Sequence, residues 1–249
     1  MGGHLRRMKG NERMEKLTGR VYYLPHDART DRPVLGYIRG ERYALMVDAG
    51  NSAAHAALFE RQRRELGLPA PAFVGLTHWH WDHVYGLHAL GAVSVASRQT
   101  GDYLARMARW GWSDEEMEGR IASGEDIPFC CDNIKKEYPD RSQIVVKNAD
   151  LLFEGGLRLD LGGEVCRACQ VGGPHSPDSV VYLLERAGVL FLGDCACEDF
   201  HHGPAHYPQK ELGELIGRLE ALDFEIALTG HWQPQSKEEI LHDLKEHIW

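Results

Sequence analysis

The sequence of 249 residues lacks the features that would place it in a membrane, on a nucleic acid or outside the cell. No apolar run reaches the ~18 residues that a membrane-spanning helix needs. The formal net charge of -9 disfavours binding to nucleic acid or to an acidic membrane, because both require a basic field. The N-terminal segment has basic residues but no apolar stretch of the kind found in secretion signals. We therefore expect a cytoplasmic protein with neither kind of partner.

Cysteine is sparse, with six residues in the whole chain. Because a secretion signal is missing, we expect free thiols rather than disulfides. Cys166 and Cys169 have CxxC spacing, but no second pair completes a tetrahedral zinc site, and their surroundings are typical of a strand. We interpret these two residues, and also Cys195 and Cys197, as structural.

Apolar residues make up 43% of the chain, enough for a packed core, and they fall into two similar halves. The first half predicts strands, then a helix from Ser52 to Leu66 that Gly67 ends. The second half predicts further strands, a helix at 209–222 and a last helix from Ser236. The predicted strands cover residues 20–24, 34–38, 43–50, 72–78, 92–96, 142–148, 151–161, 165–171, 179–185, 188–194 and 225–231.

The order of these elements predicts an α/β fold in one domain spanning residues 1–249, because no low-complexity linker divides the halves. Two mixed β-sheets packed face to face, with helices outside, would form a four-layer αββα sandwich. Residues 100–138 have a helical pattern, with a good N-cap at Ser113. We interpret this segment as a helical insertion that covers a site and shapes substrate choice.

The stretch LTHWHWDHVYG, residues 76–86, places four potential metal ligands within six residues: His78, His80, Asp82 and His83. A helix would set His78 and His80 roughly 200° apart, whereas extended chain puts residues two apart on one side. We therefore expect a loop at the end of a buried strand rather than a helix. By the same alternation, Trp79 and Trp81 are expected to pack beneath the loop.

Three further candidate ligands lie just beyond or between predicted strands: His175, Asp194 and His231. Sheet edges can hold side chains from distant segments accurately enough for a metal site. Five histidines and two aspartates suffice for two divalent ions with open positions. These donors suit zinc, iron or manganese, and zinc is the metal we expect.

This ordered set of motifs, from VDAG at residues 47–50 through HxHxDH to the later His, Asp and His, resembles the metallo-β-lactamase superfamily. The resemblance implies that His78, His80 and His175 hold a first metal, that Asp82, His83 and His231 hold a second, and that Asp194 bridges the two. Asp194 is similar to the bridging residue of glyoxalase II, rather than to the cysteine ligand of many true β-lactamases.

The expected activity is metal-dependent hydrolysis of a small ester, thioester, lactone or related molecule. Hydroxide shared by two metals would attack, with Asp82 as the catalytic residue that orients it. The chain lacks a GxSxG motif, but this chemistry needs no serine nucleophile. A persulfide dioxygenase with a single iron and a non-catalytic metal-binding protein remain alternatives. The substrate and the oligomeric state are not determined by the sequence.

The remaining polar and aromatic residues near the motifs receive weaker interpretations. Tyr85 either points into the site or packs in the core, and His88 is interpreted as an ordinary helix residue. His201, His202 and His206 lie on a loop shortly after Asp194. We expect these three histidines to be solvated, although one of them could approach the metals.

Overall fold

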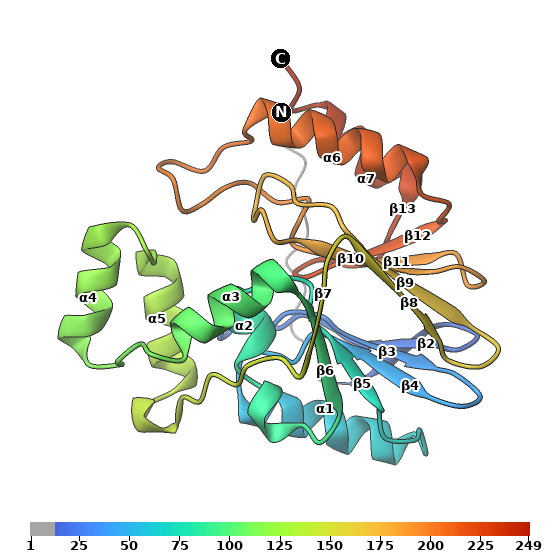
Figure 1. Cartoon of the computed structure of the whole chain (residues 1–249), viewed down its shortest axis with the longest axis horizontal. Helices are drawn as coiled ribbons and strands as arrows, with labels where there is room; N and C mark the ends of the chain where they lie inside the picture. Colours follow the sequence, from blue (N-terminus) through green and yellow to red (C-terminus); the bar gives the residue numbers. More distant parts are fainter. Residues whose placement is uncertain (1–12) are drawn as a thin grey trace.

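Two mixed β-sheets occupy the centre of the computed structural model, which describes residues 13–249 (Figure 1). The basic N-terminal segment interpreted above lies almost entirely outside the described residues. The first sheet has the order β1-β2-β3-β4-β5-β6-β7. Its strands are β1 (Glu15–Thr18), β2 (Val21–Leu24), β3 (Leu35–Arg39), β4 (Ala44–Val47), β5 (Phe73–Gly75), β6 (Val93–Ser97) and β7 (Leu151–Phe153).

The second sheet has the order β13-β12-β11-β10-β9-β8. Its strands are β8 (Gly156–Asp160), β9 (Val165–Gln170), β10 (Val180–Leu184), β11 (Val189–Gly193), β12 (Ile226–Thr229) and β13 (Gln235–Ser236). Both sheets combine antiparallel pairs with parallel ones, the latter being β4 to β7 in the first sheet and β11 with β12 in the second. The prediction of two mixed sheets is therefore confirmed.

Helices cover the outer faces of the two sheets, which gives the expected four layers (Figure 1). Helix α1 (Ala53–Glu65) lies outside the first sheet, and α6 (Gln209–Ala221) and α7 (Lys237–Lys245) lie outside the second. Ser52 caps α1 as predicted, because its hydroxyl accepts a hydrogen bond from the backbone N–H of His55 at 3.0 Å. No helix in the described part of the chain is long and apolar enough to cross a membrane.

Three helices occupy the segment expected to be a helical insertion: α3 (Arg98–Met107), α4 (Asp114–Ser123) and α5 (Pro128–Glu137). They project to one side of the two sheets (Figure 1). The N-cap predicted at Ser113 is present as part of a capping box. The Ser113 hydroxyl accepts from the Glu116 backbone N–H at 3.2 Å, and the Glu116 carboxylate accepts from the Ser113 backbone N–H at 3.0 Å. At the far end, Glu137 anchors α5 by accepting hydrogen bonds from Arg32 at 2.8 Å and from Ser52.

The space between the sheets is filled by apolar side chains from both of them, including Leu45, Val47, Tyr182 and Phe191. Tyr182 also fixes the start of the histidine motif, since its hydroxyl donates to the carbonyl of Leu76 at 3.0 Å. Gly75 makes this approach possible, because a Cβ there would lie 2.5 Å from the Tyr182 ring. Burial of such side chains contributes roughly 1.5–3 kcal/mol each relative to exposure.

Two strand predictions in the middle of the chain need correction. Residues 142–148 form no strand: a short 3₁₀ turn, Arg141–Gln143, is followed by irregular chain. Their apolar alternation reflects packing of Ile144 and Val146 against the core of the first half. Residues 151–161 were expected as one strand but are divided between the sheets, because Gly155 turns the chain at φ 70. The polypeptide therefore passes from the first sheet to the second at this turn.

Candidate metal centre

The histidine motif begins where β5 ends, and a buried aspartate holds its first residues. Asp48, which follows β4, accepts hydrogen bonds from the Thr77 backbone N–H at 2.8 Å and from its hydroxyl at 2.9 Å. Asp48 has a left-handed backbone, with φ 61. Because β4 and β5 are parallel neighbours, their carboxyl ends place Asp48 beside Thr77, directly before His78.

The loop predicted for this motif is correct for His78 and His80 but wrong for the two candidate ligands that follow, Asp82 and His83. Helix α2 (Trp81–Val84) begins directly after His80, which is its N-cap. Successive residues on a helical turn lie about 100° apart. This short turn allows Asp82 and His83 to reach one ion site together while Trp81 is buried in the core.

His78, His80 and His175 form the first ligand group, with their candidate ligand atoms within 4.8 Å of one another. His175 Nε2 lies 2.8 Å from His80 Nδ1, and buried His78 Nε2 has no hydrogen-bond partner. The carbonyl of Glu198 accepts from His175 Nδ1 at 3.0 Å, which leaves the lone pair of Nε2 facing the other two histidines. Nitrogen lone pairs that converge in this way fit a cation.

Asp82, His83, Asp194 and His231 form the second ligand group. Asp82 Oδ2 lies 3.2 Å from His83 Nε2 and 3.1 Å from His231 Nε2. Asp194 Oδ2 lies 3.3 Å from His83 Nε2, 3.1 Å from His231 Nε2 and 3.7 Å from His175 Nε2. One oxygen of Asp194 therefore reaches both groups.

Gly230 allows Asp194 to occupy this central position. Asp194 follows β11 and His231 follows β12, and these strands are parallel neighbours. A Cβ at Gly230 would lie 1.9 Å from Asp194 Oδ1. Any side chain at residue 230 would therefore displace the shared carboxylate, which explains the glycine before His231.

The histidines of the second group have carboxylates behind them. Asp48 Oδ2 lies 2.7 Å from His83 Nδ1, and Asp31 Oδ1 lies 3.5 Å from His231 Nδ1. His26 also contacts His231, with 3.2 Å between their Nδ1 atoms. Partners of this kind fix the orientation of a ligating ring and raise its basicity.

The two groups differ in the pKa values of their histidines. In the first group, burial lowers the pKa values of His78 and His80 well below the usual value for histidine. Burial also lowers the pKa of His175. In the second, burial acts in the same direction, but the neighbouring carboxylates outweigh it and raise the pKa of His83 and His231 well above its usual value. These carboxylates include Asp82 and Asp194.

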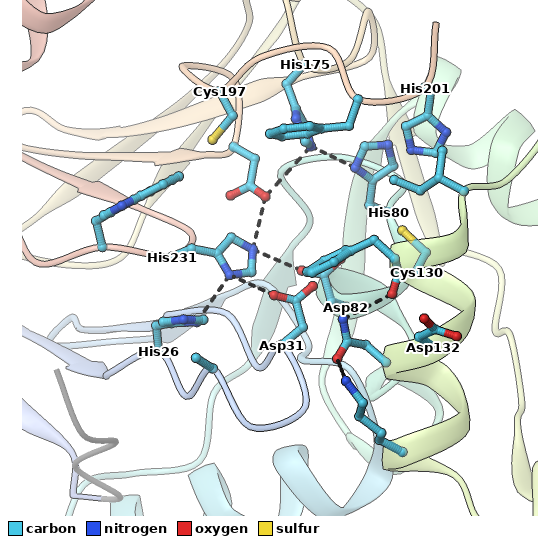
Figure 2. A pocket seen from close by; sticks show the side chains of 18 of the residues that line it. His26, Asp31, His80, Asp82, Cys130, Asp132, His175, Cys197, His201 and His231 are labelled. Atoms are coloured by element: carbon cyan, nitrogen blue, oxygen red, sulfur yellow. Dashed lines mark hydrogen bonds and ion pairs between the residues drawn. The ribbon is translucent and has the colours of Figure 1, made fainter. Parts of the chain in front are cut away.

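Both groups open into one pocket of about 960 Å³ (Figure 2). Figure 2 shows His231 and His26 on one side of this space, and Cys130 and Asp132 projecting from α5 on the other. The loop after β11 adds Cys197, Phe200 and His201, and the segment after β12 adds Trp232. Helix α5 is therefore a wall of the pocket that contains the ligands.

Two residues of this site, His26 and Asp31, were not identified from the sequence, and His201 was expected to be solvated. His26 and Asp31 line the pocket, and His201 lines it too, with its ring stacked on that of His80 at 4.9 Å. The expectation that the loop histidines are solvated is therefore wrong for His201, because the loop folds back over the first group. His202 and His206 are exposed as expected. The alternative that one of these three histidines approaches the site therefore applies to His201.

The aromatic residues of the motif pack as expected. Trp79 stacks on Tyr103 of α3 at 4.8 Å between ring centroids, and its indole N–H donates to Ser176 at 3.1 Å. This bond ties the histidine motif to the segment that carries His175. Tyr85 is fully buried against Trp112 and is not among the pocket residues, which decides between its two interpretations.

All six cysteines are free thiols. Cys166 and Cys169 lie on β9, three residues apart, so their side chains project from opposite faces of the sheet. Cys195 is fully buried, and burial raises the pKa of its thiol. Cys197 differs from the expectation of a purely structural residue, because it also lines the pocket.

The fold and this ligand arrangement agree with comparisons to known proteins. The family model of the metallo-beta-lactamase superfamily matches residues 33–231. The chain therefore belongs to this superfamily. None of the curated proteins compared with the chain matches it.

Solved structures with the same fold come from several organisms. A metallo-beta-lactamase from Pontibacter korlensis has a TM-score of 0.67 and 18% identity, covering 93% of this chain and 96% of that chain. A metallo-beta-lactamase family protein from Thermus thermophilus has 0.66 and 22%, covering 93% and 80%. A superfamily protein from Sulfolobus tokodaii has 0.59 and 19%, covering 92% and 86%. At these identities the similarity establishes a shared fold.

The seven candidate ligands fit divalent metal ions, on the chemistry of their donor atoms. Each group offers imidazole nitrogens, and the second adds carboxylate oxygens, a set that zinc, iron and manganese all accept. Several of these buried atoms, including His78 Nε2 and Asp194 Oδ1, have no hydrogen-bond partner. A bound cation would satisfy them. The donor set does not by itself select one metal, so zinc stays a prediction.

Proposed function

We propose that the protein is a metal-dependent hydrolase that holds two divalent ions and acts on a small ester, thioester, lactone or related molecule. The position of Asp194 is the observation that carries this proposal. Its Oδ2 lies within 3.7 Å of nitrogen atoms from both ligand groups, so one carboxylate would serve both ions. A shared carboxylate reduces the repulsion between two cations and fixes their spacing.

When bound, two such ions would lower the pKa of a water toward neutrality and polarise a carbonyl oxygen. Asp82 lines the pocket and is the residue we assign to orienting the attacking water, by accepting its hydrogen bond. His83 and His231 outweigh the effect of burial and hold the pKa of Asp82 below its usual range, so it is a carboxylate at neutral pH. It can therefore accept this hydrogen bond throughout the physiological range.

Hydrolysis in this pocket requires no nucleophile from the chain. The oxygen of water adds to the carbonyl carbon, the bond from that carbon to the leaving oxygen or sulfur breaks, and the leaving group takes up a proton. Burial raises the pKa of Cys130 and Cys197, the two thiols that line the pocket, well above its usual value. Both thiols are therefore protonated and poor nucleophiles at neutral pH.

We favour hydrolysis over the single-iron dioxygenase alternative because the second ligand group has four donors and the first has three. Asp82, His83 and His231 converge as closely as the three histidines of the first group, and the carboxylate of Asp194 joins them. A single ion in the first group would leave this second set without a function. We further infer that α3, α4 and α5 influence substrate choice, since α5 lines the pocket.

Metal content and oxygen dependence test the proposed function together. The protein would be purified without oxygen, its metals quantified, and product formation measured on chromogenic esters, thioesters and lactones with and without dissolved oxygen. We expect close to two equivalents of zinc or manganese and turnover that does not depend on oxygen. One equivalent of tightly held iron, with oxygen consumed in proportion to product, would overturn the proposal in favour of a dioxygenase.

A further inference from the structure

Three large apolar side chains are exposed within the pocket. The exposed fractions are 56% for Phe129, 39% for Phe200 and 38% for Trp232. They come from three separate segments: the first turn of α5, the loop after β11 and the segment after β12. Exposed apolar groups that gather around a cavity are typical of a binding site for an apolar ligand. We call these three residues the aromatic rim.

The aromatic rim borders both ligand groups. The ring of Phe200 contacts that of His175 in the first group, with 6.0 Å between centroids. The ring of Trp232 contacts that of His231 in the second group, with 6.3 Å between centroids. A molecule that reacts between the two groups would therefore extend its remaining atoms across these rings.

The third member of the aromatic rim, Phe129, lines the pocket from helix α5. Phe129 precedes Cys130, which projects toward the pocket from α5 (Figure 2). Ile127, the N-cap of this helix, lines the pocket as well. Pro128 occupies the first position of α5, where a missing N–H is tolerated, so the helix starts at the pocket and presents apolar residues to it.

Away from the two ligand groups, the charged residues of the pocket disfavour a further anionic group on the substrate. Among its lining residues in the described part of the chain, Lys136 is the only lysine or arginine. Its ammonium donates to Asn133 at 3.2 Å. Carboxylates are more numerous, and two of them, Asp31 and Asp132, are not in either ligand group. Phosphate and carboxylate groups are usually recognised by arginine or clustered cations, and the part of the pocket outside the ligand groups has no such cluster.

We propose that the pocket selects uncharged carboxylic esters, lactones included, that carry an extended apolar acyl or aryl group, and that Phe129, Phe200 and Trp232 recognise this group. The inference rests on the proposed hydrolase function, which supplies the ester chemistry. The volume of about 960 Å³ suits a ligand of this size, since pockets for small molecules span roughly 300–1,000 Å³. This proposal narrows the substrate class from any small ester or thioester to uncharged esters with an apolar group.

The first test compares p-nitrophenyl esters of increasing acyl length, from acetate to octanoate, on the metal-loaded full-length protein. Burial of one methylene can increase kcat/KM by up to about fourfold. We expect octanoate to exceed acetate by more than about tenfold, and the variant Phe129→Ala/Phe200→Ala/Trp232→Ala to lose most of this ratio. An equal or lower kcat/KM for octanoate in the parent, or an unchanged ratio in the variant, would overturn the proposal.

Two controls separate recognition from general effects. Leu151→Ala removes an apolar side chain that is 51% exposed on β7 and outside the pocket, so both esters should be turned over as by the parent. Phe129→Leu keeps an apolar side chain on α5 and should retain most of the chain-length ratio. A glutarate monoester tests charge, because it matches pentanoate in length but carries a carboxylate. A higher kcat/KM for the glutarate monoester than for the pentanoate ester would contradict the proposed selection for uncharged substrates.

Binding of 2-alkanones separates this inference from the proposed function, because these neutral ketones are not hydrolysed. Calorimetry would measure the affinity of 2-nonanone and 2-pentanone for parent and triple variant. We expect 2-nonanone to bind the parent more than about tenfold tighter, and the variant to lose this difference. If no ester is hydrolysed but this pattern is found, recognition of an apolar group by the aromatic rim is supported and the hydrolase assignment is refuted. If esters are hydrolysed without any length dependence in rate or binding, the aromatic rim is refuted and the hydrolase assignment stands.

Discussion

The two candidate ligand groups open into one pocket and lie around one carboxylate, that of Asp194, but the pKa values of their histidines are shifted in opposite directions. The first group is made of three histidines whose pKa values burial lowers. The second combines two histidines with Asp82 and Asp194, and these carboxylates raise the histidine pKa values. In the ion-free protein at neutral pH, the first group is therefore neutral, and protons occupy the place of a cation in the second.

This difference implies that two ions would bind to the two groups under different conditions. An ion entering the first group meets free lone pairs, whereas an ion entering the second must displace protons. The second group compensates with negative charge, since Asp82, Asp194 and Asp48 lie around His83. We expect the first group to fill over a wider pH range, and the second to depend on its carboxylates.

The largest effect should come from removing the residue that the two groups share. Asp194→Ala deletes the oxygen that reaches His83, His231 and His175. We expect the second ion to be lost and kcat/KM to fall by more than about 100-fold, since even partners behind a ligand change activity 10- to 100-fold. Metal analysis and ester kinetics measure both. Asp199→Ala, five residues along and outside the pocket, is the control. If Asp194→Ala still retained two ions, the second group would not depend on this carboxylate, and the proposed difference between the groups would be refuted.

Asp82→Asn should affect the second group alone. The substitution keeps the shape of the side chain but removes the charge that lies 3.1 Å from His231 Nε2. We expect weaker retention of the second ion and a fall of roughly 100-fold, mainly in kcat, because the attacking water loses its acceptor. Steady-state kinetics at saturating metal separate the two effects. If Asp82→Asn retained both ions and turned over a confirmed substrate with the same kcat as the parent, the role assigned to Asp82 would be contradicted.

Lower pH should empty the second group before the first. Raised pKa values keep His83 and His231 protonated until the pH is well above 6.5, so binding there displaces protons and weakens about tenfold per pH unit for each proton displaced. Lowered pKa values keep His78 and His80 unprotonated below pH 6.5. Dialysis from pH 8 to pH 5, followed by metal analysis, should show loss in two steps. Loss of both ions in one step would refute unequal protonation.

The smallest effect should come from the carboxylate behind His83. Asp48→Asn weakens the 2.7 Å contact with His83 Nδ1. We expect about a tenfold lower affinity for the second ion and little change for the first, because the asparagine Oδ1 can still accept from the Thr77 backbone N–H. Glu164→Gln is a matched control, because Glu164 is also buried but accepts backbone N–H groups of Arg186 and Ala187 far from the ligands. Equal losses at both ions, or the same loss in the control, would show a general effect on folding.

The seven candidate ligands could be located from the sequence because each lies in a short motif next to a strand end. Such motifs are local: alternation places His78 and His80 on one side, and a glycine next to Asp194 or His231 marks a close approach of the backbone. The short α2 was missed because its four residues, Trp81–Val84, are too few for helical periodicity to appear. The sequence therefore predicts which residues are candidate ligands, but it does not predict the helical geometry of Asp82 and His83.

The surroundings of the ligands could not be derived in the same way, because they depend on tertiary contacts. Asp31 reaches His231 from a left-handed backbone at φ 58, across 200 residues of sequence. Arg32, next to it, is held by Glu137 at the end of α5. Likewise, residues 151–161 form an apparently continuous strand pattern, and only packing assigns β7 and β8 to different sheets. Local patterns contain no information about such pairings.

X-ray anomalous scattering from crystals of the zinc-loaded protein tests the central claim most directly. We expect two zinc peaks in the pocket: one ligated by His78, His80 and His175, the other by Asp82, His83 and His231, with Asp194 between them. The second peak should weaken first as the crystals are moved to lower pH. A single peak at the first group at every pH, with His83 and His231 still bonded to carboxylates, would contradict the account.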